Sequence, residues 1–177
     1  FRSHGDTISY ADSSHAIDVD LRDSLEVRYS AGDDDLGESP TKLVGSPFAD
    51  TIHGDSYGNR LDGGSGDDTI LGGGGNDTIT GSGSANLVDG GAGADQISTG
   101  LGNDTIRFDA ADTVNAGEGQ DVLDINTLTT ADLRPLAGVQ LTGIEEIDLT
   151  GDGVQDLRLD AASVLALSDT TDTVKIH

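Results

Sequence analysis

Acidic and amide side chains recur at nine-residue intervals between residues 45 and 124, and these are the side chains of the sequence that could do chemistry. Three complete copies, at 63–71, 72–80 and 90–98, read Gly-Gly-x-Gly-x-Asp-x-apolar-x. The glycines permit a positive φ and close backbone approach, so the first six places predict a tight turn. Stacked turns bring free carbonyl oxygens and carboxylates together, and Ca²⁺ takes six to eight such oxygens. The acidic or amide residues of the successive copies are Asp50, Asn59, Asp68, Asp77, Asn86, Asp95, Asp104, Asp112 and Asp121.

The elements that must position these turns are very short strands formed by the last three places of each copy. The eighth place is aliphatic in every copy, which predicts a stacked core, while its neighbours, such as Thr69 and Thr78, point outward. A period kept over this length indicates a solenoid, in which two nonapeptides make one coil and turns eighteen residues apart share a flank. A disordered Gly/Asp-rich tract is the alternative, but disorder would not keep one phase aliphatic. The predicted core residues are Ile52, Leu61, Ile70, Ile79, Val88, Ile97, Ile106, Val114 and Leu123.

The complete copies resemble the RTX, or hemolysin-type calcium-binding, repeats of secreted bacterial proteins. The resemblance covers roughly the middle half of the chain. It implies an all-β fold, a right-handed parallel β-helix (β-roll) with N- and C-terminal capping segments. It also implies that several Ca²⁺ ions lie between turns of one flank, held by carbonyls of the first four places and by the sixth-place Asp.

Carried over to this chain, the resemblance places the strongest site between Gly72–Asp77 and Gly90–Asp95, because both turns are complete. Asp50 with Asp68 is the second predicted pair. The remaining pairs are weaker where Asn brings no charge (Asp68–Asn86 and Asn86–Asp104) or where the short copy at 108–115 is expected to break the register (Asp95–Asp112 and Asp104–Asp121). The predicted metal-binding residues are Asp50, Gly63, Gly64, Ser65, Gly66, Asp68, Gly72, Gly73, Gly74, Gly75, Asp77, Gly81, Gly83, Asn86, Gly90, Gly91, Ala92, Gly93, Asp95, Gly100, Gly102, Asp104, Asp112 and Asp121.

Composition also points to a cation-dependent solenoid. The 177 residues are only 34% hydrophobic and 3% aromatic, which suits a thin aliphatic stack better than a globular core. The formal charge of −24 opposes any compact state by self-repulsion and excludes nucleic acid as a partner. Of the 33 acidic residues five are Glu, which leaves 28 Asp, the shorter carboxylate that fits tight turns. There is no Cys, and no apolar run has the length of a transmembrane helix.

Three regions follow from the pattern: an N-terminal β cap at 1–44, the nonapeptide array at 45–124 and a C-terminal cap at 125–177. In the first region, 6–10, 17–21 and 25–29 predict strands, and 31–40, with Asp33-Asp34-Asp35, predicts a loop. In the last, strands are predicted at 141–149, 154–159 and 171–176. Asp160 is the predicted N-cap of a short helix over 161–167. Caps are expected because the end of a solenoid exposes unpaired strand edges.

A separate motif, Asp148 to Asp156, places oxygen-bearing side chains around two glycines. It begins like an EF-hand loop, but Leu159 stands where that loop requires Glu. It resembles the shorter calcium loops of integrin-type propellers, with Thr150 in place of an acidic residue or Asn. A plain β-turn between two strands is the competing interpretation.

The sequence predicts a protein without catalytic function. The histidines, His4, His15, His53 and His177, lack zinc-ligand spacing, and no nucleophile motif lies between a strand and a helix. We therefore expect a monomeric calcium-binding module of a secreted or cell-surface bacterial protein, with no membrane insertion. Because the sequence begins at Phe1, we expect it to be a piece of a larger secreted chain. The alternatives are an adhesive module that binds glycan or another surface and an accessory domain of a secreted enzyme, such as a protease or polysaccharide epimerase.

Overall fold

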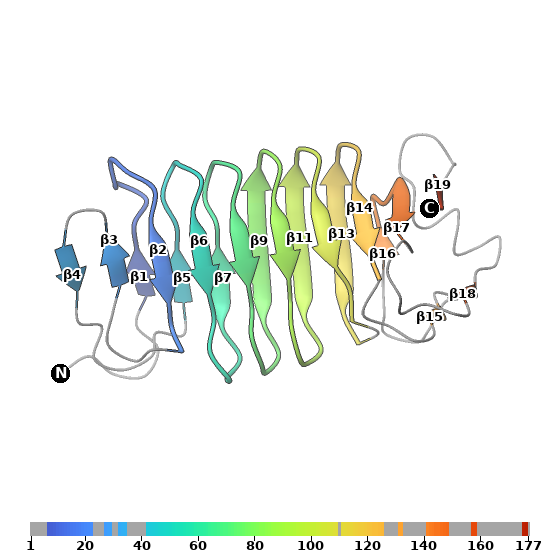
Figure 1. The fold of residues 1–177 in the computed structure, drawn as a ribbon, viewed down its shortest axis with the longest axis horizontal. Helices are drawn as coiled ribbons and strands as arrows, with labels where there is room; N and C mark the ends of the chain where they lie inside the picture. The colour runs from blue at the N-terminus through green and yellow to red at the C-terminus, as the bar shows by residue number, and fades with distance from the viewer. Residues whose placement is uncertain are drawn as a thin grey trace.

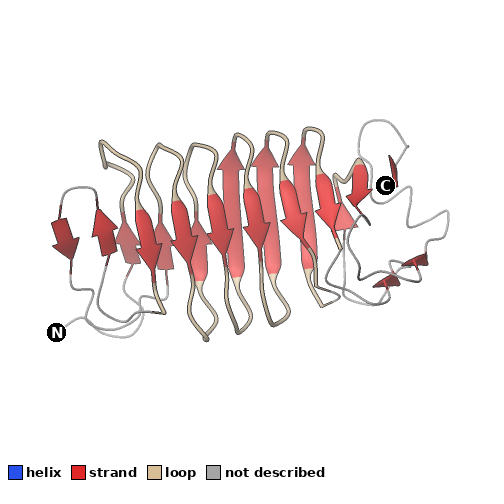
Figure 2. Cartoon of the chain, in the orientation of Figure 1, coloured by secondary structure: helices blue, strands red, loops and turns tan. Residues whose placement is uncertain are grey.

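The computed structural model describes residues 7–22, 27–29, 32–34, 42–109, 111–125, 131–132, 141–148, 157–158 and 175–176. These residues form a flattened parallel β-solenoid in which two sheets face each other across a narrow core (Figure 1). They contain strands and turns but no helix, and hence no helical segment able to cross a membrane (Figure 2). The predicted all-β parallel β-helix is confirmed.

From β5 to β14 successive strands alternate between the two sheets, as expected for a coil of two nonapeptides. The seven-stranded sheet contains, in spatial order, β1 (Thr7–Ser9), β5 (Lys42–Val44), β7 (Arg60–Asp62), β9 (Thr78–Gly83), β11 (Gln96–Leu101), β13 (Thr113–Glu118) and β16 (Leu141–Thr142). The ten-stranded sheet contains β19 (Lys175–Ile176), β17 (Glu146–Asp148), β14 (Val122–Asp124), β12 (Thr105–Arg107), β10 (Leu87–Asp89), β8 (Thr69–Leu71), β6 (Thr51–His53), β2 (Asp18–Asp20), β3 (Val27–Tyr29) and β4 (Gly32–Asp34). A separate pair joins β15 (Ala131–Asp132) to β18 (Leu157–Arg158).

The core is the predicted stack of eighth-place aliphatic side chains. Ile52 pairs with Ile70 and Val88 with Ile106 in one sheet, and Leu61 pairs with Ile79 in the other. All nine predicted core residues are buried. Residues outside the array extend the stack: Ile17 and Val19 at one end, Ile144 and Ile147 at the other. Because each strand contributes a single inward aliphatic side chain to this core, a chain with few apolar residues is able to form it.

The short copy does not break the stacking, so the expected loss of register was wrong. Val114 pairs with Ile97 in a continuous parallel ladder, seventeen rather than eighteen residues away. The missing residue falls in the turn at 108–112, while the strand that follows keeps its place. A turn can absorb a deletion because its backbone is not held by a ladder on both sides.

Past residue 124 the stacking continues, because β16 pairs with β13 and β17 with β14. The single strand predicted at 141–149 is therefore two strands in different sheets, separated at Gly143, whose φ is +70°. The predicted helix at 161–167 and most of the Asp148–Asp156 motif lie outside the described residues.

At the N-terminal end, β2 pairs in parallel with β6, and β3 and β4 continue the same sheet in antiparallel fashion. Residues 7–9, 18–20 and 27–29 thus form strands within the three predicted N-terminal segments. The loop predicted at 31–40 was wrong for 32–34, since Asp33 and Asp34 lie in β4 at the edge of the sheet.

Candidate metal centre

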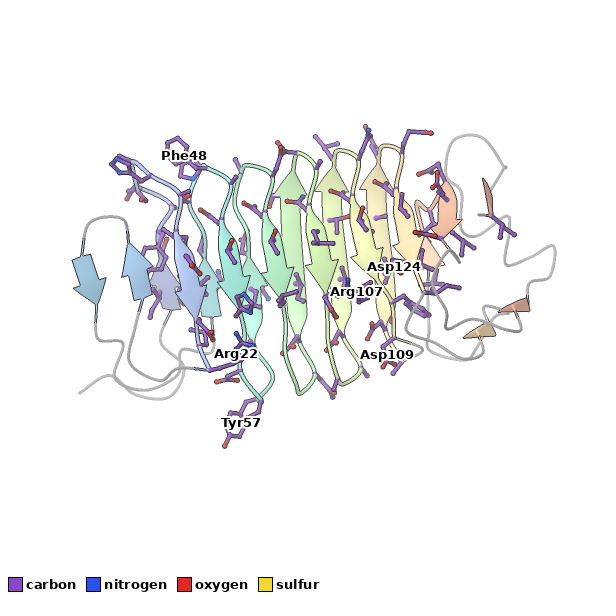
Figure 3. The ribbon with its side chains drawn as sticks, in the orientation of Figure 1. Arg22, Phe48, Tyr57, Arg107, Asp109 and Asp124 are labelled. Atoms are coloured by element: carbon purple, nitrogen blue, oxygen red, sulfur yellow. The ribbon has the colours of Figure 1, made fainter. Side chains whose placement is uncertain are left out.

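The turns lie in two rows along opposite edges of the solenoid. The first turn row joins the seven-stranded to the ten-stranded sheet and contains 45–50, 63–68, 81–86, 99–104 and 116–121. The second turn row returns to the seven-stranded sheet and contains 54–59, 72–77, 90–95 and 108–112. In Figure 3, Phe48 marks the upper edge of the ribbon, while Tyr57 and Asp109 mark the lower edge.

Glycine is needed in the complete turns for two different reasons. The second and fourth places have φ in the left-handed region, at +93° for Gly64 and +118° for Gly66. The first place needs Gly for space, because a Cβ on Gly72 would meet the Asp77 Oδ2 and the carbonyl oxygen of Gly90. A side-chain carboxylate and a carbonyl of the next coil therefore converge on the same small volume.

One oxygen of each sixth-place carboxylate binds the backbone of the preceding coil. The Asp77 N–H donates to the Asp95 Oδ1 at 2.8 Å, and the Asp50 N–H donates to the Asp68 Oδ1 at 2.8 Å. The N–H of Asn86 makes the same bond to the Asp104 Oδ1 at 2.7 Å. These bonds hold each carboxylate between two stacked turns, with its orientation fixed.

The second oxygen of four of these carboxylates is buried without a donor. The Oδ2 atoms of Asp68, Asp77, Asp95 and Asp104 accept no hydrogen bond from any residue that the structure describes. The four residues are 1%, 2%, 1% and 0% exposed. A buried polar atom without a partner costs about 1–3 kcal/mol, and more when it is charged. The turns therefore fit a cation that would take these oxygens as ligands.

The electrostatics of the turns agree with this geometry. Burial raises the pKa of Asp68 to about 7 and the pKa of Asp77 to about 6. Backbone hydrogen bonds lower both pKa values, but the effect of burial is larger. Burial also raises the pKa of Asp95 and Asp104. Among the described residues no group of three or more His, Cys, Asp or Glu side chains gathers, so carbonyl oxygens would have to complete any coordination shell. Ca²⁺ accepts such mixed oxygen ligands.

The structure brings together the turns that the sequence paired. Turns 72–77 and 90–95 stack directly, with the Gly75 N–H donating to the Ala92 carbonyl at 2.9 Å. The pairs disfavoured from sequence are also joined: the N–H of Asp95 donates to the Asp112 Oδ1 at 3.1 Å, and the N–H of Asp104 to the Asp121 Oδ1 at 2.8 Å. Neither pair is disrupted by the short copy.

The turn at 81–86 departs most from the complete pattern. The second and fourth places are Ser82 and Ser84, which adopt φ of +90° and +94° although neither is Gly. The Asn86 Nδ2 donates to the Ser84 carbonyl at 3.0 Å and to the Asp104 Oδ1 at 3.2 Å. An amide donor thus lies beside Gly81, where the complete turns present a carboxylate oxygen.

One residue in a position equivalent to the sixth place, Glu145, was not recognised from the sequence. Glu145 is buried, and its Oε2 accepts the Asp121 N–H at 2.9 Å, the bond that a sixth-place Asp makes elsewhere. The signal was an acid two residues before a core aliphatic, Ile147, as in the repeats. Asn59 was placed at the sixth place of its copy but was not paired with another turn, and its N–H donates to the Asp77 Oδ1 at 2.7 Å.

Two stacked sheets joined by rows of glycine turns that present buried carboxylates define a parallel β-solenoid of the β-roll kind. The family described as RTX calcium-binding nonapeptide repeat (4 copies) matches residues 44–79, 71–106 and 108–124. The chain thus carries an array of RTX repeats, and the resemblance stated from the sequence is confirmed. No curated protein and no solved structure matches the chain.

Proposed function

We propose that this chain is a non-enzymatic module that folds when Ca²⁺ enters its turns, and that it does so outside the cell as part of a larger secreted or surface protein. The observation that carries the proposal is a set of four buried Oδ2 atoms that accept no hydrogen bond from the residues that the structure describes. They belong to Asp68, Asp77, Asp95 and Asp104. In a chain of formal charge −24, each of these oxygens disfavours the folded state until a cation binds it.

The proposed ligands are the carboxylates of these four residues together with turn carbonyls. For the second turn row, the Asp77 Oδ2 and the carbonyl of Gly90 already converge beside Gly72. A bound Ca²⁺ supplies positive charge that neutralises the buried carboxylates. The chain's own part is to fix the carboxylates through the inter-coil N–H bonds and to keep water out with the stacked turns.

Linkage explains why such a module would be unfolded inside a cell and folded outside. Extracellular modules bind Ca²⁺ with a Kd on the order of 10⁻⁴–10⁻³ M. A ligand at roughly 100 times its Kd contributes about 2.7 kcal/mol per site to the folded state. Several coupled sites would together match the whole stability of an ordinary domain, about 5–15 kcal/mol. An unfolded chain in the cytosol is what export through a narrow channel requires.

The test is circular dichroism of the purified chain in chelator and in millimolar calcium, with magnesium as the matched control. We expect a coil spectrum in chelator or magnesium and a β spectrum in calcium, with a cooperative transition. Magnesium should fail because it demands near-ideal octahedral geometry and gives up its water reluctantly. A chain equally folded in chelator and in calcium would refute calcium-driven folding.

An adhesive module is the second candidate, and one surface favours it. The outward side chains of β9, β11 and β13 at the seventh and ninth repeat places are uncharged, although the molecule is strongly acidic: Thr78, Thr80, Gln96, Ser98, Thr113 and Asn115. The three strands are six residues long and in register, so these side chains lie in rows on one polar face. A neutral glycan would meet no charge repulsion there.

A glycan array read with calcium and with chelator tests this candidate. We expect calcium-dependent binding of neutral glycans that is lost when Thr80 and Ser98 are both replaced by Lys. Binding that is absent, or that survives both replacements, would leave calcium-dependent folding as the only proposed role.

A further inference from the structure

Turns 45–50, 54–59 and 108–112 differ from the complete turns in what satisfies the sixth-place side chain. In turn 45–50 the Asp50 Oδ2 accepts the Ser46 N–H at 2.5 Å. The Asp50 Oδ1 accepts the Ser46 hydroxyl at 2.7 Å and the Ile17 N–H at 2.8 Å. Both oxygens of this carboxylate are therefore bound by the chain itself.

In the other two turns the chain also binds the side-chain oxygens, through different residues. In turn 54–59 the Asp55 N–H donates to the Asn59 Oδ1 at 2.9 Å, as the Ser46 N–H does in the turn before. In turn 108–112 the Asp109 N–H donates to the Asp112 Oδ2 at 3.0 Å, and the Asp95 N–H donates to its Oδ1 at 3.1 Å. We refer to these three as the closed turns.

The four turns with a donorless Oδ2, at 63–68, 72–77, 90–95 and 99–104, are the open turns. Their second place is Gly with a positive φ, at +93° for Gly64 and +89° for Gly91. In turns 63–68 and 90–95 the second-place N–H accordingly points away from the sixth-place side chain and toward the end of the preceding strand. The Gly64 N–H donates to the Asp62 Oδ1 at 3.2 Å, and the Gly91 N–H to the Asp89 Oδ1 at 3.0 Å.

The direction of one peptide group thus decides what can bind the second oxygen. An N–H that points at this oxygen places a partial positive charge where a cation would have to sit. Ser46 and Asp55 lie outside the left-handed region, so their N–H groups stay pointed inward. With the N–H turned away, the same oxygen is buried and accepts no bond from the described part of the chain.

We propose that the closed turns hold no cation, although all three lie within the matched RTX repeats, and that calcium occupies the open turns alone. This assignment rests on the proposed calcium-binding function. Its consequence is that the first coil, residues 42–62, is closed by hydrogen bonds and stacks on the N-terminal segment without metal. The Thr51 N–H donates to the Ile17 carbonyl at 2.9 Å and the Tyr10 N–H to the Val44 carbonyl at 2.8 Å, so this coil is joined to residues 7–22 by backbone bonds.

Matched Asp→Asn substitutions test the assignment on the full 177-residue chain. The closed-turn variants are Asp50→Asn and Asp112→Asn, and the open-turn variants are Asp77→Asn and Asp95→Asn. Bound calcium per chain is measured by equilibrium dialysis at saturating calcium, with circular dichroism to confirm folding. We expect the closed-turn variants to bind as many ions per chain as the unaltered protein, and the open-turn variants to bind fewer.

The possible results separate this assignment from the proposed function. An unaltered chain that binds no calcium refutes the proposed function. Calcium binding by the unaltered chain that is reduced in folded Asp50→Asn or Asp112→Asn overturns only the assignment. If a closed-turn variant does not fold, anomalous scattering from crystals of the unaltered protein with calcium decides the question. Peaks beside the Oδ2 of Asp77 and Asp95, and none beside the Oδ2 of Asp50 or Asp112, support the assignment. A peak beside either closed-turn carboxylate overturns it.

Discussion

Replacing Ser82 and Ser84 together by Gly should stabilise the calcium-loaded protein. Both serines adopt a positive φ in a turn where the complete repeats have glycine. A non-glycine residue in this region costs about 1–2 kcal/mol. Glycine loses more conformational freedom on folding, which takes back about 0.5–1 kcal/mol at each place. The double variant should therefore gain about 1–2 kcal/mol in total.

Urea denaturation at saturating calcium measures this gain, with Ser65→Gly as the control. Ser65 lies in the neighbouring turn outside the left-handed region, so glycine there should only destabilise, by about 0.5–1 kcal/mol. For a denaturant slope of about 2 kcal/mol per M, the double variant should raise the urea midpoint by about 0.5–1 M. If the midpoint falls in both proteins alike, backbone strain at Ser82 and Ser84 is not what limits this turn.

Three further predictions follow from the turns and the core. Burial raises the pKa of Asp68 to about 7 and of Asp77 to about 6, above the ordinary value of 3.8, so the metal-free folded state binds more protons than the unfolded chain in this range. The contribution of these groups to stability is thus fully present below about pH 4 and is lost as the pH rises through 6 to 7. Circular dichroism of calcium-depleted protein should show more β-structure at pH 4.5 than at pH 8, and the opposite order would contradict the role given to burial. Gly72→Ala should raise the calcium concentration needed for folding several-fold, because the added Cβ would meet the Asp77 carboxylate. The control is Gly83→Ala, whose Cβ would meet no described atom within 4 Å and which should leave that concentration within about twofold. Equal shifts of the two variants in a calcium titration would argue against a site beside Gly72. Ile79→Ala, in the fully buried stack, should lower the free energy of unfolding in calcium by about 2–5 kcal/mol in a urea titration, and a loss below about 1 kcal/mol would mean that the stack is not the core.

Sequence reasoning predicted the stacked core and the row of carboxylates because both are set by a local period. An aliphatic residue at every eighth place needs no knowledge of distant contacts, and all nine such residues are buried. The same period placed Asp77 and Asp95 on one row of turns, as the structure has them.

The closing of individual turns could not be predicted, because it depends on contacts that the period does not contain. Asp50 is held partly by the N–H of Ile17, thirty-three residues earlier and outside the array. The effect of the short copy was misjudged for a related reason. Counting residues treats a deletion as a shift of everything that follows, whereas in the structure the turn at 108–112 shortens and Val114 still meets Ile97.

The choice between Asp and Glu along the first turn row follows from turn length. In a full-length turn the sixth-place Asp follows the inward residue of the preceding strand by seven residues, as Asp104 follows Ile97. The Asp104 carboxylate reaches the Asn86 N–H of the preceding coil while its second oxygen stays inside the turn. Glu145 follows Leu141, the residue that pairs with Val114, by only four residues, and the Glu145 N–H donates to the Asp121 carbonyl at 3.1 Å. Glu145 also reaches the Asp121 N–H, at 2.9 Å, through a side chain one methylene longer. A chain with 28 Asp among its 33 acidic residues thus uses Glu where a shortened turn must still make the inter-coil bond. The bond from backbone N–H to carboxylate, more than the acidic charge itself, is therefore what the spacing of these residues preserves.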